Sequence, residues 1–161
     1  MRVLSFTQPW ATLVCRGEKE FETRSWKSWY YGTILIHASK AYPGWAKQLE
    51  KEEPFYSSLR PHGQYSYPEL ACGHIIGSAE VVECIPTEAA LNLISEKERA
   101  FGDYGPGRYA WRLRDPRFLP KPIPAKGHLG LWEFDFGNST NEQTDVRQVP
   151  IPSGHAQRDE A

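Results

Sequence analysis

The sequence has few cysteines, no long apolar run and almost no net charge. Its three cysteines, Cys15, Cys72 and Cys84, lie far apart, without the paired spacing of a zinc site or the even number of a disulfide framework. No stretch approaches the roughly 18 apolar residues of a membrane-spanning helix, and the N-terminus lacks the apolar segment of a signal peptide. These absences predict a cytoplasmic protein with neither a membrane anchor nor structural disulfides.

The chain does contain enough apolar and aromatic material for one core. Of its 161 residues, 40% are hydrophobic and 13% aromatic, including six tryptophans. This length and composition predict a single domain over residues 1–136. Residues 137–161 are polar and poor in core-forming side chains, so we expect a flexible tail there. The net charge of −1 gives no overall basic field for a nucleic acid, so such a field would have to be local.

Hydrophobic periodicity predicts a sheet with short helices. Residues 2–7 alternate between apolar and polar, and residues 32–38 are mostly β-branched or apolar. Gly17 follows a helical stretch, and Gly77 marks a bulge inside a long strand. We expect strands at 2–7, 21–24, 32–38, 74–85, 108–114, 118–123 and 129–136, helices at 10–16, 43–53 and 87–101, and an irregular connection at 54–73. The pattern predicts an α+β or mainly-β fold, a partly open β-barrel with short helices packed around it.

The first forty residues also contain a series of specific motifs. They read LSFTQPWA from Leu4, then Gly17-x-Lys19, Glu22-x-Arg24-x-Trp26 and Ile36-His37-Ala38. A later strand reads RYAWRL from Arg108, and Gly130-Leu-Trp132 follows it. Together these motifs resemble the ASCH domain family over about residues 3–136.

The resemblance implies a PUA-like β-barrel and a function connected with nucleobases. Members of the family include small amidohydrolases and nucleic-acid-binding modules, one of them a domain of a transcriptional coactivator. The leading hypothesis is a metal-free amidohydrolase that removes the acyl group from N4-acetylcytidine and related N4-acylated cytosine nucleosides. Its partner would be a small-molecule nucleoside or a modified RNA base, and no cofactor is expected. The alternatives are a non-catalytic RNA- or DNA-binding module and, third, a nuclease.

The resemblance also suggests catalytic residues. The amidohydrolases of the family use a lysine, a threonine and a glutamate, and their lysine follows a glycine by two residues, as Lys19 does here. Their threonine lies three residues further on, where this chain has Glu22, with Thr23 next to it. The role of the threonine therefore falls to either Glu22 or Thr23. The third residue lies in the helix before the last strands, where Glu96 and Glu98 are candidates and Glu98 is selected.

A lysine–carboxylate pair offers the chemistry that amide hydrolysis needs. The reaction requires a base for water, a donor for the oxyanion and an acid for the departing amine. On a regular strand, however, positions 19 and 22 point to opposite faces. The pair converges only if the strand begins after Lys19. An exposed ion pair of little energetic value is the alternative interpretation of the same residues.

Three further groups of residues could bind a base or a phosphate. They are the start of the first helix, the cations and aromatic rings interleaved over residues 24–31, and the end of the strand at 32–38. The candidates are Gln8, Pro9, Trp10, Arg24, Trp26, His37 and Lys40. A core position for Trp10 and a buried hydrogen bond for His37 are the structural alternatives.

A basic run follows in the second half of the chain. In the alternative function, an RNA contact would run through Arg108, Arg112 and Arg114, although a solvated sheet face is the commoner explanation of such a run. The five histidines show no ligand spacing with cysteines or carboxylates, so no metal is expected.

Overall fold

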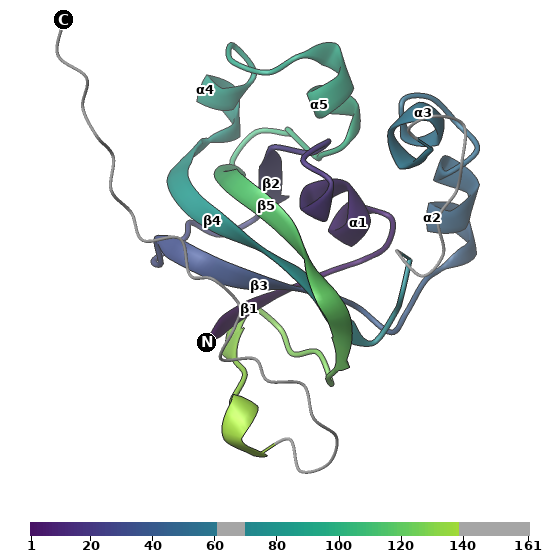
Figure 1. Ribbon diagram of the computed structural model, residues 1–161. Coiled ribbons are helices and arrows are strands. Elements are labelled where there is room, and N and C mark those ends of the chain that lie inside the picture. The colour runs from purple at the N-terminus through teal and green to yellow at the C-terminus, as the bar shows by residue number, and fades with distance from the viewer. Residues whose placement is uncertain (61–69, 139–161) are drawn as a thin grey trace, which may run out of the picture.

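The computed structural model describes residues 1–60 and 70–138, which form one curled sheet surrounded by short helices (Figure 1). The strands are β1 (Arg2–Phe6), β2 (Phe21–Arg24), β3 (Gly32–Ala38), β4 (His74–Pro86), β5 (Tyr109–Pro124) and β6 (Leu131–Glu133). The helices are α1 (Trp10–Cys15), α2 (Gly44–Leu49), α3 (Phe55–Leu59), α4 (Thr87–Ala90) and α5 (Glu96–Ala100), and a 3-10 turn follows at Phe136–Asn138.

The six strands lie in the order β2-β5-β4-β3-β1-β6. β1 pairs with β3 in parallel, and the other neighbouring strands are antiparallel. The sheet curls into a half-barrel, with α1 inside the curve and α4 and α5 beyond one end of β4 and β5 (Figure 1). The expected fold class, a PUA-like partly open barrel of the α+β kind, is confirmed.

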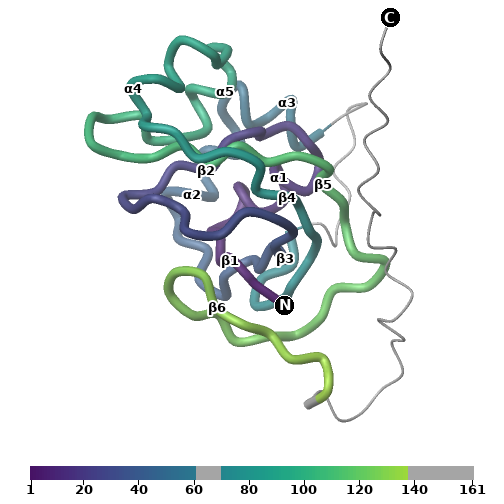
Figure 2. The backbone as a smooth tube through the Cα atoms, turned by 90° about the vertical axis from the view of Figure 1, so that its left-hand side faces the viewer, coloured from purple at the N-terminus to yellow at the C-terminus, as the bar shows by residue number. Residues whose placement is uncertain are grey.

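Buried clusters lie on both faces of the sheet. On the inner face, Val14 and Cys15 of α1 pack in one cluster with Leu4, Phe6 and Trp111. On the outer face, the segment after β5 crosses the sheet to reach β6 beside β1 (Figure 2). The outer cluster contains Val3, Leu35 and Ile75, and the side chains packed against it include Leu119 of β5, Trp132 of β6 and Phe134 just after β6.

Several element boundaries differ from those predicted. The strands expected at 108–114 and 118–123 form the single strand β5, because β4 pairs with it over nearly its whole length. The helix expected at 87–101 is two short helices, and the Ser95 side chain caps the second by accepting the Glu98 N–H at 3.1 Å. α2 ends at Leu49, α3 lies within the expected irregular connection, and β6 covers only three residues of the strand expected at 129–136. Residues 61–69 of that connection and 139–161 of the expected tail lie outside the described residues.

The expected bulge at Gly77 is confirmed, since the register of β4 against β5 shifts between Ile75 and Gly77. A Cβ built on Gly77 would lie 2.3 Å from the Arg117 carbonyl oxygen and 2.4 Å from Cys15 Sγ. Gly77→Ala is therefore expected to destabilise the fold by about 1–3 kcal/mol, because α1 or β5 must shift. Urea denaturation measures this loss. Gly44→Ala is the matched control, because its Cβ meets nothing within 4 Å, and equal midpoints for the two variants would contradict the close packing.

Candidate active site

The segment between α1 and β2 bends sharply, and this bend decides where Lys19 points. Gly17 has a φ of 75°, a backbone conformation that glycine adopts at little cost. The N–H groups of Glu18 and Lys19 both donate to the Leu13 carbonyl oxygen, at 3.0 and 3.2 Å. β2 begins only at Phe21, so Lys19 precedes the strand and is free of its alternation.

The Glu98 carboxylate clamps this bend from α5. Its Oε2 accepts the Glu20 N–H at 2.9 Å, and its Oε1 accepts the Phe21 N–H at 3.0 Å. Burial raises the pKa of Glu98, while the nearby Lys19 ammonium and these two N–H groups oppose the rise. Both carboxylate oxygens thus stabilise the chain conformation that brings Lys19 toward the sheet.

Lys19 and Glu22 converge as the hypothesis requires. Lys19 is 2% exposed, its Nζ donates to the Phe21 carbonyl oxygen, and the same Nζ lies 3.7 Å from Glu22 Oε2. On the other side of Glu22, Arg24 Nε donates to Oε1 at 2.8 Å. We call Lys19, Glu22, Arg24 and Glu98 the Lys19 cluster. It contains two basic and two acidic side chains.

Thr23 faces away from this cluster. Residues alternate along β2, so the Thr23 side chain lies on the face opposite to Glu22 and Arg24. Its Oγ1 accepts the Asp103 N–H at 3.0 Å, which fixes the loop after α5 against β2. The arrangement favours Glu22, rather than Thr23, as the partner of Lys19.

The residues expected at the start of α1 mainly hold that helix in place. Gln8 is fully buried, and its side chain accepts the Thr12 N–H at 3.1 Å and donates to the Ala71 carbonyl oxygen at 3.2 Å. Pro9 is the N-terminal flanking residue of the helix. The Trp10 indole donates to the Phe101 carbonyl oxygen at 2.7 Å, and its ring packs in the cluster of α1 and α3, as the structural alternative for Trp10 describes.

Trp26 packs against the core of the barrel. Its ring meets that of Trp111 edge to face at 4.6 Å, and its carbonyl oxygen accepts the Trp111 indole N–H at 3.3 Å. Trp26→Ala is expected to cost roughly 3 kcal/mol of stability, the lower end for losing a buried aromatic ring. Thermal unfolding tests this. Trp29→Ala is the control, because Trp29 is 60% exposed. Unchanged stability together with weaker nucleoside binding would restore the base-stacking role predicted from the sequence.

His37 and Lys40 are not brought to the Lys19 cluster. His37 lies on β3 between Ile36 and Ala38, which face the inner core, so its ring lies on the outer face of the sheet. One ring nitrogen is 3.0 Å from Ser5 Oγ and the other 2.9 Å from the Ala125 carbonyl oxygen. Burial lowers the pKa of His37. Lys40 is exposed beyond the end of β3.

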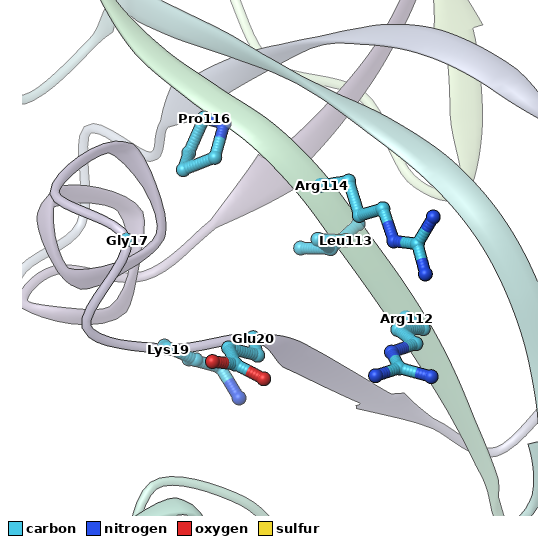
Figure 3. A pocket seen from close by; sticks show the side chains of 7 residues that line it. All are labelled: Gly17, Lys19, Glu20, Arg112, Leu113, Arg114 and Pro116. Carbon is cyan, nitrogen blue, oxygen red and sulfur yellow. The ribbon is translucent and has the colours of Figure 1, made fainter. Parts of the chain in front are cut away.

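The basic run on β5 divides into two parts. Arg108 stabilises the loop after α5, because its Nε donates to the Asp103 carbonyl oxygen at 3.1 Å. Arg112 and Arg114 instead line a pocket of about 270 Å³ (Figure 3). The other residues of this pocket are Gly17, Lys19, Glu20, Leu113 and Pro116. Arg112 also lies 3.7 Å from Glu83, so part of its charge is compensated.

One buried polar group outside the cluster escaped the sequence analysis. The Tyr104 hydroxyl is buried and has no hydrogen-bond partner among the described residues. No periodic pattern marks Tyr104, which lies in a glycine-containing loop after α5. The only signal in the sequence is an aromatic residue between Gly102 and Gly105.

The described residues, 1–60 and 70–138, contain no group of three or more histidine, cysteine, aspartate or glutamate side chains placed to hold a metal ion. Within the same residues, no helix has the length and apolar content that crossing a membrane requires.

Fold and site together define the class, a small PUA-like α+β protein with a buried lysine–carboxylate cluster beside its first helix. The chain belongs to the ASCH domain family, whose model matches residues 4–120.

The chain is also similar to known proteins. Activating signal cointegrator 1 of Mus musculus and that of Homo sapiens are each 24% identical to the chain over 132 residues, or 82% of its length. The match covers 22% of each of these proteins, so the chain spans about a fifth of their length. Among solved structures, ASCH from Zymomonas mobilis is 17% identical, with a TM-score of 0.45 over 76% of this chain and 72% of that one.

Proposed function

We propose that this ASCH protein is an amidohydrolase that removes the acyl group from N4-acetylcytidine and related N4-acylated cytosine nucleosides. The observation that supports this most is the convergence of Lys19 and Glu22. An ammonium and a carboxylate 3.7 Å apart, with the ammonium closed off from solvent, form a pair suited to proton transfer.

The proposed reaction assigns one role to each member of the pair. Glu22 accepts a proton from a water molecule whose oxygen forms a bond to the acyl carbon. The bond from that carbon to N4 breaks, and N4 takes a proton from the Lys19 ammonium. The proton on Glu22 then returns to Lys19 once the two groups, 3.7 Å apart in the structure, close to hydrogen-bond distance. The products are a carboxylic acid and the free amino group of cytosine.

Burial and charge both bear on the substrate. The Lys19 side chain is 1% exposed, whereas those of Glu22 and Arg24 are 12% and 22% exposed. Glu22 and Arg24 are therefore more accessible than Lys19, and side chains must move before a substrate reaches Lys19, either from their side or from the pocket on β5 that Lys19 also lines. Because the cluster pairs two basic with two acidic groups, it supplies no surplus cation for a phosphate, and this favours a neutral nucleoside.

The direct test is incubation of the purified protein with N4-acetylcytidine, followed by chromatography for cytidine and acetate. Turnover in the presence of a strong chelator would support a metal-free amidohydrolase. No turnover with N4-acetylcytidine or with longer N4-acyl cytidines would overturn the proposed function.

A second candidate, an RNA-binding module, is favoured by the pocket on β5. Arg112 and Arg114 lie on the same strand at this pocket (Figure 3), the Arg112 side chain is 40% exposed, and Arg114 is exposed as well. A phosphate contact there gives affinity that falls as salt rises. Salt-dependent RNA binding that Arg114→Ala weakens, without any turnover by the wild type, would select this candidate.

A further inference from the structure

The segment after β5 forms a strap across the outer face of the sheet. We use this name for residues 125–134, which run from the end of β5 to the residue after β6 (Figure 2). At the start of the strap, the Ala125 N–H donates to the Gly73 carbonyl oxygen at 3.1 Å. At its end, the Phe134 N–H donates to the Met1 carbonyl oxygen at 2.9 Å. Side chains of the strap pack against the outer cluster, so its position keeps apolar surface covered.

A chain of hydrogen bonds through His37 ties the strap to β1 and β3. The Nε2 atom of His37 lies 2.9 Å from the Ala125 carbonyl oxygen, which can only accept, so Nε2 carries the proton. Nδ1 is then an acceptor, and the Ser5 hydroxyl donates to it at 3.0 Å. The Ser5 oxygen in turn accepts the Trp132 indole N–H at 3.1 Å. The neutral imidazole therefore satisfies every partner in this chain.

The same arrangement does not suit a second proton on His37. The residue is 1% exposed, and a Cβ on Gly127 of the strap would lie 2.6 Å from its ring carbon Cε1. The strap thus lies directly on the imidazole and keeps water away from it. A proton added at Nδ1 would face the hydrogen of the Ser5 hydroxyl, which would have to turn away from its acceptor. A buried donor without an acceptor costs free energy, and so does a buried charge.

The charges around His37 also oppose its protonation. Burial lowers the pKa of His37, the hydrogen bond to the Ala125 carbonyl oxygen opposes this change, and the nearby His74 of β4 and His128 of the strap lower the pKa further. With the strap open, an exposed imidazole would regain the ordinary histidine pKa of about 6.5. The open form then binds the proton more readily than the closed form. The closed strap therefore loses stability as the pH falls from about 6.5 toward the lowered pKa of the closed form.

We propose that the strap is a pH-sensitive element of the fold, which lies closed on the outer face while His37 is neutral and opens when His37 takes up a second ring proton. Opening would separate β6 from β1 and uncover the outer cluster of Val3, Leu35 and Ile75. The inner cluster would stay buried, because α1 packs on the other face of the sheet. This inference does not depend on the proposed amidohydrolase.

The experiment follows the hydrogen exchange of single backbone amides by NMR, from about pH 7.5 to about pH 5.5, on either side of the ordinary histidine pKa. The protection of the Ala125 and Phe134 N–H groups, corrected for the intrinsic pH dependence of exchange, is expected to fall by up to about tenfold per pH unit. The Leu113 N–H, which donates to the Glu20 carbonyl oxygen at 2.8 Å beside the bend before β2, is the internal control. Its protection should stay constant.

Two variants assign the effect to His37. Glutamine at this position retains a donor for Ala125 and an acceptor for Ser5 but gains no proton in this pH range. The protection of the strap in His37→Gln should therefore no longer change with pH. His128→Gln is the matched control, because it removes an exposed histidine of the same strap and should keep the pH dependence.

Each outcome has a definite meaning. Strap protection that is constant with pH in the wild type, or equally pH-dependent in His37→Gln, would overturn the inference. A parallel loss at Leu113 would show that the whole domain opens, and would also overturn it. If His37→Gln does not fold, NMR titration of His37 in the wild type decides. A pKa below the ordinary value, with the Ala125 and Phe134 signals changing at the same pH, would support the inference, whereas a pKa at or above that value would overturn it.

Discussion

Replacing Lys19 by methionine is expected to lower the turnover of N4-acetylcytidine by at least about 10²-fold, the lower range for a general acid or base. Methionine keeps most of the apolar stem but removes the ammonium that lies 3.7 Å from Glu22. Lys19→Arg distinguishes proton transfer by Lys19 from stabilisation by its positive charge alone. Arginine retains the charge but does not release a proton near neutral pH, so it should be almost as damaging if Lys19 transfers a proton. Steady-state kinetics on folded variants measures both effects.

Two comparisons make this prediction specific. Lys97→Met removes an exposed lysine that pairs with Glu18 on the surface, and its turnover should match that of the wild type. Glu22→Gln changes the partly exposed member of the pair with little loss of volume, so it tests the same chemistry if Lys19→Met does not fold. A folded Lys19→Met variant with the turnover of the wild type would remove Lys19 from the mechanism.

Glu98→Ala is expected to produce the largest loss of stability, about 3–5 kcal/mol, because two backbone N–H groups lose a charged acceptor at a cost of about 1–3 kcal/mol each. Without this carboxylate, the Glu20 and Phe21 N–H groups lose their acceptor and the buried Lys19 loses one of its two acidic neighbours. Urea denaturation with an unchanged m-value measures the loss.

Glu96→Ala is the matched control for this prediction, because Glu96 lies in the same first turn of α5 but is exposed. A surface substitution of this kind usually changes stability by no more than about 0.5 kcal/mol. The stability of Glu98→Gln should lie between those of Glu98→Ala and Glu96→Ala. Its amide retains one acceptor oxygen but turns an N–H group toward a backbone donor. Equal stabilities for Glu98→Ala and Glu96→Ala would show that the clamp contributes nothing.

The strands of the first half of the chain could be predicted because their pattern is local. The alternation in β1 and the apolar residues of β3 follow the period of two that a sheet imposes. β5 could not be predicted as one strand, because its prolines resemble strand breakers. In the structure, β2 accompanies β5 only over Tyr109–Arg112. Beyond that point one edge of β5 has no neighbouring strand among the described residues, so a proline with no N–H is tolerated there.

The candidate site was only partly predictable for a similar reason. Spacing and family resemblance selected Lys19 and Glu22, but whether they converge depends on where β2 begins. That is decided by Glu98, which lies 78 residues after Glu20 in the sequence, and by its two hydrogen bonds to the bend. His37 was proposed as a ligand contact, but the face of β3 on which it lies became clear only from the neighbouring strands.

The position of β1 between β3 and β6 also affects how the chain folds during synthesis. Of the six described strands, β1 is synthesised first, yet its antiparallel partner contributes residues 131–133, and the Phe134 N–H donates to the Met1 carbonyl oxygen. Contacts this distant in sequence are slow to form, and one edge of β1 remains available for wrong pairing until they do. The Lys19 cluster likewise cannot form until Glu98 has been synthesised and has left the ribosome. Nascent chains halted before α5 should therefore contain an incomplete site. A chaperone that shields free strand edges would be most useful between the synthesis of β1 and that of β6.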